Sequence, residues 1–591
     1  MNRLYFGDNL EWLRDKREFP DVSVDLVYLD PPFNSNADYN VLFREPSGQV
    51  SQAQFHAFTD TWSWADAADT YHHFIDNCPN VAVVEMMEAF HTFLKHSPMM
   101  AYLAMMAPRL VELNRILKPT GSLYLHCDPT ASAYLKMMLD GIFDPVNFRN
   151  EIVWRRTNAH NKLSRQYGPI HDTILFYART KQTKVHPGRR PYLKNYVKDN
   201  FPHKDERGFY QSNVLTGSGT RTGESGQRWR HYNPTSKGRH WAIPEKLLNE
   251  LPEIERTLPV QEILERLDKR QLLLHPRSAT SLPRYKQYLE SSTGVLYQDI
   301  WAYQPGTSGL LEGSEESIDQ DVKWLDSEEE KLGYQTQKPV GIIERILETS
   351  TNAGDVVLDP FCGCGTTIHA AQKLDRQWIG IDITYLAINL IKRRLKDAFG
   401  EEIEFEEKGQ PTDFASAKRL AELDKFQFQH WALSLIGARP LKEGEGKGAD
   451  RGVDSLLYFY ETERKDIPGR VMEEPLPKSE PVHREKIIVQ VKGGGVNRSD
   501  VATLLGDVEN QKAAGGVLIT LEKPSKQMRT EAADAGRYAS KVWHDKDYPR
   551  IQILTVEGLL NGSERVDAPP QINPFAMAAR EATREKQTEM L

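Results

Sequence analysis

At 591 residues, the chain is too long for one hydrophobic core, and about two to four domains are expected. Its 39% hydrophobic and 27% charged residues are typical of a soluble globular protein, and its net charge of −8 excludes a uniformly basic chain. No uninterrupted apolar run approaches the roughly 18 residues that a membrane span needs. Four cysteines and a start without an export signal predict a reduced, cytoplasmic protein.

The first motif, Leu-Asp-Pro-Pro-Phe-Asn at 29–34, comes at the end of an apolar run. The run predicts a buried strand of an α/β sheet. The double proline predicts a rigid turn, because Pro31 and Pro32 fix their φ angles and lack N–H donors. We expect this turn to direct the Asp30 carboxylate, the Pro31 carbonyl and the Phe33 ring into the crevice beyond the strand, where open α/β sheets bind ligands. A plain exit from strand to loop is the alternative for this motif alone.

The segment that follows alternates between predicted helices and strands. An insertion at 39–98 is rich in Trp, His and Met and predicts helices on the substrate side. The apolar spacing then predicts helices at 105–117 and 131–143, and strands at 151–156 and 173–177. The pair His171-Asp172 at the last strand suggests either a general base or a satisfied pair at a strand entry, and the second interpretation is favoured.

A basic segment lies between residues 151 and 240. It contains 18 Lys and Arg against 6 Asp and Glu, a surplus of 12 positive charges. Aromatic residues are interleaved with these charges: Trp154, Tyr167, Tyr192, Tyr196, Phe209, Tyr210, Trp229 and Tyr232. A solvated face is the alternative, but charge of one sign mixed with aromatic rings favours contact with phosphates and bases.

The second motif, Val-Val-Leu-Asp-Pro-Phe-Cys-Gly-Cys-Gly-Thr-Thr at 356–367, predicts a strand, a glycine-rich turn and a helix that begins at Thr366. Glycines such as Gly363 and Gly365 permit close approach of a ligand to the backbone, and the start of the helix offers N–H groups. The next apolar run ends at Asp382, 19 residues after Gly363, close to the roughly 20-residue spacing of a ribose-binding acid. Turn, helix and acid together predict a nucleoside cofactor.

The two motifs together resemble the circularly permuted beta class of DNA amino-methyltransferases, in which an Asp-Pro-Pro-aromatic catalytic motif precedes the S-adenosyl-L-methionine motif. The resemblance covers roughly the first two-thirds of the chain. It implies catalytic roles for Asp30, Pro31, Pro32 and Phe33, with Phe33 replacing the commoner Tyr. It implies cofactor contacts for a second set of residues: Asp8, Lys338, Asp359, Phe361, Gly363, Gly365, Thr366 and Asp382.

The chemistry of the implied substrate fits the first motif. An exocyclic amine is a poor nucleophile because its lone pair is delocalised into the ring, and Asp30 and the Pro31 carbonyl can accept its hydrogen bonds. Phe33 can stack on a base flipped out of double-stranded DNA, which offsets part of an unstacking cost of a few kcal/mol. The Asp at the first position favours adenine N6 over cytosine N4, whose enzymes more often carry Ser there; cytosine N4 stays the alternative.

A second α/β pattern begins after about residue 420. Here Asp454 and Gln490-x-Lys492 resemble the Mrr-like branch of the restriction-endonuclease superfamily. The resemblance implies Asp454 as a ligand of Mg²⁺, with Gln490 and Lys492 on one strand face and Lys492 near the scissile phosphate. An acid expected on the first helix is not evident at 426–430. The alternatives are an enzyme whose main task is cutting and an inactive DNA-binding or partner-docking module.

The expected fold class is α/β: a Rossmann-like S-adenosyl-L-methionine-dependent methyltransferase sheet with an inserted target-recognition region, plus a smaller α/β restriction-endonuclease-like C-terminal domain. The expected partners are double-stranded DNA and, in a restriction-modification setting, a second copy of the chain or a restriction subunit. The expected boundaries are 1–180 for the catalytic half, 181–330 for target recognition, 331–400 for the cofactor-binding half, 401–420 for a linker, 421–561 for the nuclease-like domain and 562–591 for a flexible tail.

Overall fold

The computed structural model divides the chain into two compact units. The first comprises residues 1–186, 299–301 and 321–591, and the second comprises residues 187–298 and 302–320. Within these units the structure describes residues 2–32, 64–158, 167–183, 185–186, 188–278, 281–292, 294–325, 330, 332, 334, 336–440, 453–460, 484–540, 547–569 and 571–572.

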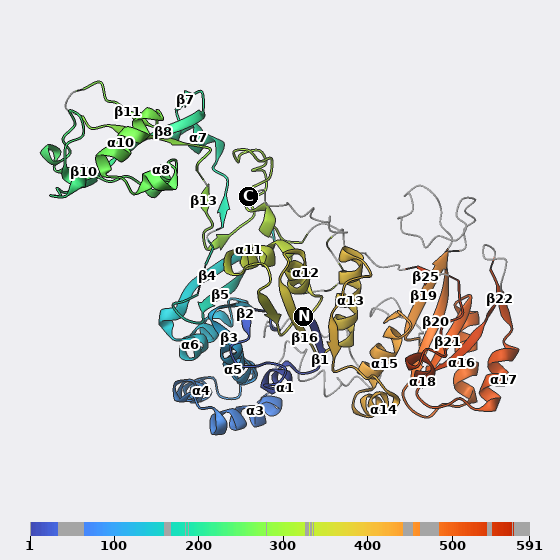
Figure 1. The fold of residues 1–591 in the computed structure, drawn as a ribbon. Helices are drawn as coiled ribbons and strands as arrows, with labels where there is room; N and C mark the ends of the chain where they lie inside the picture. The colour runs from blue at the N-terminus through green and yellow to red at the C-terminus, as the bar shows by residue number, and fades with distance from the viewer. Residues whose placement is uncertain are drawn as a thin grey trace. The chain divides into compact units, whose positions relative to one another are not determined.

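A nine-stranded sheet in the order β14-β4-β5-β3-β2-β15-β16-β1-β17 forms the centre of the first unit (Figure 1). Its strands are β1 (Arg3–Phe6), β2 (Val24–Leu29), β3 (Leu117–Cys127), β4 (Phe148–Arg155), β5 (His171–Ala178), β14 (Ile300–Trp301), β15 (Val356–Asp359), β16 (Gln377–Asp382) and β17 (Glu406–Lys408). The run from β3 to β17 is parallel, and β5 is antiparallel to both β3 and β4. This arrangement confirms the predicted α/β class with a Rossmann-like sheet.

Helices cover both faces of this sheet, because alternate residues of the central strands point to opposite sides. On β2, Val27 and Leu29 belong to one core cluster, whereas Leu26 and Tyr28 belong to the other. The first cluster includes α1 (Asn9–Arg14), α3 (Trp64–Asn77), α4 (Val81–Leu94), α5 (Pro98–Ile116) and α6 (Ser132–Phe143). The second includes α11 (Val340–Ser350), α12 (Thr366–Lys373) and α13 (Tyr385–Phe399).

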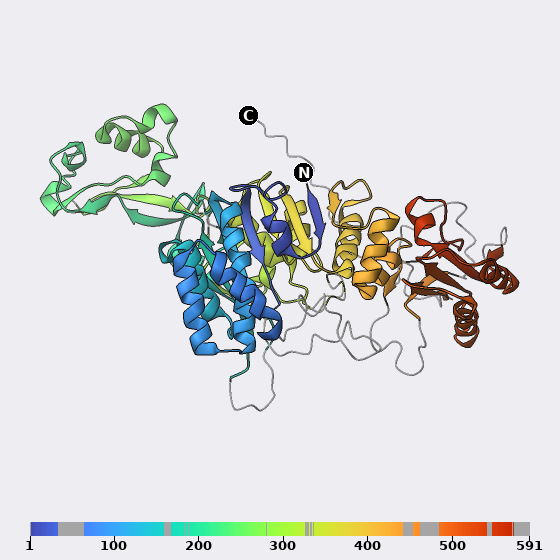
Figure 2. The ribbon, with the colours of Figure 1, turned by 90° about the horizontal axis from the view of Figure 1, so that it is seen from below.

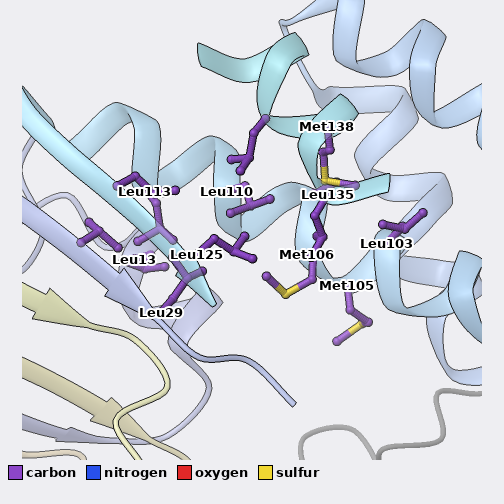
Figure 3. Packing of buried hydrophobic residues seen from close by; sticks show 14 of the residues in the cluster. Leu13, Leu29, Leu103, Met105, Met106, Leu110, Leu113, Leu125, Leu135 and Met138 are labelled. Atoms are coloured by element: carbon purple, nitrogen blue, oxygen red, sulfur yellow. The ribbon is translucent and has the colours of Figure 1, made fainter. Parts of the chain in front are cut away.

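Helix α5 is longer than the sequence predicted. It begins at Pro98 rather than at residue 105, because the Ser97 side chain accepts from the N–H of Met100 and proline suits the first helical position. Pro108 lies inside the helix, not in its first turn. Figure 3 shows Met106 and Leu110 of α5 packed among buried leucines of the neighbouring elements. This burial by tertiary packing overrides the helix-breaking tendency of the proline.

The second unit has its own small core. Its four-stranded antiparallel sheet has the order β11-β12-β8-β7, with β7 (His203–Asp205), β8 (Gly208–Val214), β11 (Leu273–Leu274) and β12 (Arg284–Tyr288). Helix α10 (Val260–Lys269) packs its buried residues Ile263, Leu264 and Leu267 into a cluster with Trp229 and Trp241. The apolar spacing of residues 260–270 suits a short helix, and α10 forms there, whereas the short strands of this sheet show no clear period in the sequence.

A six-stranded sheet and helices α14 to α18 make up residues 414–572, here called the C-terminal domain. The sheet has the order β18-β19-β20-β21-β24, with β25 paired to β19. Its strands are β18 (Arg439–Pro440), β19 (Ser455–Tyr460), β20 (Arg484–Lys492), β21 (Gly515–Thr520), β24 (Ile551–Thr555) and β25 (Gln571–Ile572). The helices are α14 (Phe414–Leu423), α15 (Lys425–Ser434), α16 (Arg498–Asn510), α17 (Lys526–Asp534) and α18 (Val556–Leu560).

Two segments that the sequence predicted as linker and tail contain regular structure. Residues 401–420 include β17, which pairs with β1 at the edge of the large sheet, and the start of α14. Part of the predicted tail, residues 571–572, forms β25. In the described part of the chain, none of the helices combines the length and apolar character that crossing a membrane requires.

Candidate active site

The two sequence motifs meet at one edge of the nine-stranded sheet. β2 and β15 are neighbouring parallel strands, so the turn after β2 and the turn after β15 leave the sheet on the same side. Asp30 follows β2 directly, and Asp359 is the last residue of β15. Pro31 is buried and Pro32 is half-buried, whereas Phe33 lies outside the described residues. Residues more than 300 positions apart therefore share one site.

Asp30 is bound by Lys338, whose ammonium group donates to Oδ2 of the carboxylate. Both side chains are largely buried, at 15% and 13% exposed. The Lys338 backbone is held in place from both sides. The preceding residue, Gln337, donates to the carbonyl of Glu330 at 2.6 Å, and the hydroxyl of Thr366 donates to the Lys338 carbonyl at 3.2 Å. The lysine that the resemblance assigned to the cofactor thus contacts the predicted catalytic acid.

The glycine-rich turn has the backbone that its sequence predicted. Gly363 and Gly365 have φ angles of +49° and +77°, which favour glycine. A Cβ atom at Gly365 would lie 2.7 Å from Cγ1 of Ile391, so packing excludes a side chain there as well. Gly365 is the N-cap of α12 and provides no capping side chain for the first-turn N–H groups, including that of Thr366. These N–H groups suit an anionic group of a ligand.

Two buried acids border this turn. Oδ2 of Asp382 accepts from the N–H of Gly363 at 2.9 Å, and Oδ1 accepts from the N–H and hydroxyl of Thr384, each at 2.9 Å. Burial raises the pKa of Asp382 to about 6. Burial, with a contribution from the nearby charge of Asp30, raises the pKa of Asp359 to about 7. A ligand with positive charge would relieve this cost of burying carboxylates.

Asp8 performs a structural task that the sequence did not reveal. Its Oδ1 accepts from the N–H of Leu10 at 2.7 Å as the N-cap of α1, and both carboxylate oxygens accept from Nη2 of Arg109, at 2.9 and 3.1 Å. The neighbouring Asn9 donates to the carbonyl of Pro360 at 2.7 Å. The segment that begins the chain is thereby fixed to the glycine-rich turn, next to half-buried Phe361. The one signal for Arg109 in the sequence is that it follows a long apolar run, Pro98 to Pro108, within the same helix.

A buried chain of hydrogen bonds crosses the sheet beside Asp30, and sequence reasoning missed it. The Tyr28 hydroxyl lies 2.9 Å from Nδ1 of His126, and Nε2 of His126 lies 3.2 Å from Oδ2 of Asp172. Arg156 pairs with the other oxygen of Asp172 at 3.2 Å. Although burial opposes it, the hydrogen bond from His126 and the nearby positive charges hold the pKa of Asp172 below its ordinary value. Asp172 thus pairs with a distant histidine rather than with its neighbour in the sequence.

The aromatic residues of the basic segment fall into two groups. Trp154, Trp229 and Tyr232 are buried, so their prediction as base contacts is wrong; they are core residues. Three others are exposed: Tyr167, Tyr196 and Phe209. Tyr196 and Phe209 lie in the second unit, which also carries exposed cations, among them Arg221, Arg228 and Lys237. The cations of this segment are therefore exposed, as contact with nucleic acid requires, but only some of its aromatic residues are exposed.

The predicted magnesium site of the C-terminal domain is not supported. Oδ2 of Asp454 accepts from the N–H of Val491 at 2.6 Å, and burial raises the pKa of Asp454 to about 7, which disfavours the ionised form that a metal needs. Gln490 donates to Asp507 at 2.9 Å, and Lys492 pairs with Asp500 at 3.5 Å. Among the residues that the structure describes, no three His, Cys, Asp or Glu side chains are grouped so as to hold a metal ion.

Comparison with known families yields two matches on this chain. Residues 24–393 match the model of a DNA methylase family, a span that includes both motifs and more than half of the chain. Residues 460–561 match the family described as NACHT-associated inactive Restriction Endonuclease 1. This family's description and the side-chain partners of Asp454, Gln490 and Lys492 give no support to the predicted metal-dependent cleavage.

Individual relatives are similar over parts of the chain. Type II methyltransferase M.EcaI of Enterobacter cloacae is 30% identical over 50% of this chain and 57% of its own length. The Mod subunit of the type III restriction-modification enzyme StyLTI of Salmonella typhimurium is 26% identical over 64% of this chain and 50% of its own length. The chain thus spans about half of the length of these relatives. A solved structure, the cytosine-N4-specific PvuII DNA methyltransferase, matches 73% of this chain and 93% of its own with 13% identity, but its TM-score of 0.30 is too low to establish a common fold.

Proposed function

The chain belongs to the DNA methylase family, and from this membership we propose that it transfers a methyl group from S-adenosyl-L-methionine to adenine N6 in double-stranded DNA. The observation that carries the proposal is that the two motifs meet at one edge of the sheet. There Lys338 donates to Asp30 of the first motif through its side chain and accepts from Thr366 of the second motif through its backbone carbonyl. A restriction-modification setting is supported by the names of the type II and type III relatives.

The residues around the glycine-rich turn fit this cofactor chemically. S-adenosyl-L-methionine offers ribose hydroxyls, a carboxylate and positive charge. Asp382 would accept hydrogen bonds from the ribose, and the first-turn N–H groups of α12 would face the carboxylate of the cofactor. The positive charge of the cofactor would compensate the buried carboxylates of Asp359 and Asp382. Phe361 and Asp8 would border the site, with Asp8 held by Arg109. When bound, the cofactor supplies an electrophilic methyl group.

The chain's own task is to bind and orient the target amine. Asp30 and the Pro31 carbonyl would accept the two hydrogens of the amine, which favours its tetrahedral, more nucleophilic form. Lys338 keeps the Asp30 carboxylate in one orientation through its charge-assisted hydrogen bond. Phe33 would stack on the flipped base. After transfer, the amine's surplus proton would pass to the Asp30 carboxylate at the same hydrogen bond.

The acceptor base follows from the first motif. Asp-Pro-Pro-Phe resembles the adenine-N6 enzymes in its acidic first position, which supports adenine over cytosine N4. The exposed Arg and Lys residues of the basic segment 151–240 support DNA as the substrate, because phosphate contacts supply a large share of the affinity of DNA-binding proteins.

The test is methyl transfer from labelled S-adenosyl-L-methionine to unmethylated double-stranded DNA, followed by digestion to nucleosides. We expect the label in N6-methyldeoxyadenosine. Label in N4-methyldeoxycytidine would correct the base but keep the activity. No incorporation, in a preparation that binds the cofactor, would overturn the proposal.

A further inference from the structure

The C-terminal domain contacts the helix that begins beside the proposed cofactor site. α15 packs on α13, and both helices lie in the first unit (Figures 1 and 2). The side-chain oxygen of Gln427 on α15 accepts from the backbone N–H of Tyr385 at 3.2 Å, and both residues are buried. Tyr385 is the first residue of α13, a position whose N–H has no acceptor within its own helix. Gln427 thus completes the cap of α13 from another domain.

This cap is one residue from the groups that hold Asp382. Thr384, the N-cap of α13, donates twice to Oδ1 of Asp382, and its hydroxyl also accepts from the N–H of Ala387 at 3.3 Å. A shift of the start of α13 would therefore move Thr384 and, with it, the Asp382 carboxylate. The position of the proposed ribose-binding acid depends on a contact that the C-terminal domain supplies.

A second contact joins the same parts through aromatic packing. The rings of Phe6 and Tyr385 stack with centroids 3.7 Å apart and an interplanar angle of 21°. Tyr385 is fully buried and belongs to the hydrophobic core of the C-terminal domain, together with Phe428 and Trp431 of α15. Phe6 packs against this core and immediately precedes Gly7, whose N–H donates to the Asp382 carbonyl at 3.0 Å. Both segments next to Asp382 are thus part of one packed cluster with α15.

The helix α15 is itself fixed to the C-terminal sheet. The Phe428 ring lies where Gly493 follows β20, and a Cβ atom at Gly493 would come within 2.9 Å of that ring. Movement of α15 is therefore tied to the end of β20, the strand that carries Gln490 and Lys492.

We propose that the C-terminal domain is a structural part of the cofactor site, and that Gln427 is a positioning residue for Asp382. The proposal rests on the proposed function. Because coupling between two sites is reciprocal, cofactor binding at Asp382 stabilises the docking of α15, and anything that displaces α15 weakens cofactor binding. The C-terminal domain thereby controls how well the methylase half holds its cofactor.

The first test is calorimetry of the full-length protein with S-adenosylhomocysteine, the demethylated form of the cofactor. Gln427→Leu removes the acceptor at nearly constant volume, and we expect the dissociation constant to rise about three- to tenfold, the usual worth of one such hydrogen bond. Gln511→Leu is the matched control, because the side-chain oxygen of Gln511 also accepts a hydrogen bond, from Lys486 at 3.1 Å, far along β20 from the contact of Gly493 with α15. Its dissociation constant should stay at the wild-type value.

The second test needs no variant. Saturating S-adenosylhomocysteine should slow amide hydrogen exchange of the wild-type protein at 425–434, the residues of α15. Equal dissociation constants for wild type and Gln427→Leu, or exchange at α15 that does not respond to the ligand, would overturn the coupling. A wild-type chain that binds no S-adenosylhomocysteine would instead overturn the proposed function, and this inference with it.

Discussion

At the scale of single residues, the site is defined by charges that the fold keeps away from water. Asp359 and Asp382 are buried with raised pKa values, and Asp30 is bound by Lys338. Burying a carboxylate is costly unless it is paired or hydrogen-bonded. The Asp382 carboxylate is stabilised by three hydrogen bonds, which come from the glycine-rich turn and from the start of α13. These acids are therefore expected to act on a ligand as well as on the fold.

Replacement of Asp382 by alanine should weaken cofactor binding. The variant loses the acceptor for the ribose hydroxyls, at about 1.5–3 kcal/mol for each hydrogen bond to the charged group. Calorimetry with S-adenosylhomocysteine measures the effect, with Glu401→Ala as a control, because that acid lies exposed on the surface after α13. A dissociation constant equal to that of the control would contradict the assignment of Asp382.

The residues of the site differ in how far the sequence could reveal them. Asp30, Gly363 and Asp382 belong to motifs in which the local order of residue types carries the chemistry, so the sequence alone predicts them, and their roles stay predictions. Arg109 and His126 were not found, because their roles depend on partners about 100 and 46 residues away, brought together by tertiary packing. Trp229 and Tyr232 were misassigned for a related reason: composition does not say which face of a segment is buried.

At the scale of elements, periodicity predicted the strands and helices that carry the motifs, and packing decided the rest. The strands β2, β15 and β16 appear where the apolar runs placed them. Helix α5 extends further because Ser97 caps it, and β17 and β25 were missed because short edge strands carry little periodic signal. In the C-terminal domain, β20 was predicted, but the partners of its polar residues were not.

The pH dependence of stability distinguishes a buried structural acid at position 454 from a metal ligand. Asp454 has a folded-state pKa of about 7 against an ordinary value of 3.8, so the folded state binds the proton more tightly. The stability that protonation confers is complete below about pH 4 and is lost as the pH rises to about 7.

Asp454→Asn should remove this dependence, since its amide oxygen can still accept from Val491. Relative to the variant, the wild type should lose about 2–3 kcal/mol of unfolding free energy between pH 5 and pH 8. Urea denaturation of both proteins at the two pH values measures the difference. A difference that does not change with pH, or a stabilisation of the wild type by Mg²⁺, would contradict this account of Asp454.

At the scale of the whole molecule, the two motifs of the candidate active site lie in the first unit, whereas much of the positively charged segment lies in the second unit. The net charge is −8, yet the segment 151–240 has a surplus of 12 positive charges, and much of it lies in the second unit. The C-terminal domain supplies no described metal site and instead packs on the element next to Asp382. The chain therefore combines the DNA methylase family's region with a C-terminal domain for which we propose a supporting role.

DNA binding by the full-length protein should depend steeply on salt. For six to ten phosphate contacts, the affinity falls by about 10³-fold or more between 50 and 200 mM salt. The double variant Arg221→Ala, Arg228→Ala should lower the log–log slope by up to about two. Arg17→Ala is the control, since Arg17 is an exposed arginine outside the basic segment. A flat plot, or an equal change of slope in the control, would place the DNA contact elsewhere.

The most direct test of the central claim is a single-turnover assay of Asp30→Ala, with cofactor affinity measured on the same preparation. Asp30 is proposed to act on the target amine, whereas the residues around the glycine-rich turn hold the cofactor. The variant should therefore lose about 10²- to 10⁴-fold in the rate of methyl transfer, while its dissociation constant for S-adenosylhomocysteine stays within about twofold of wild type. A rate near that of the wild type would contradict the claim, and so would equal losses in rate and affinity.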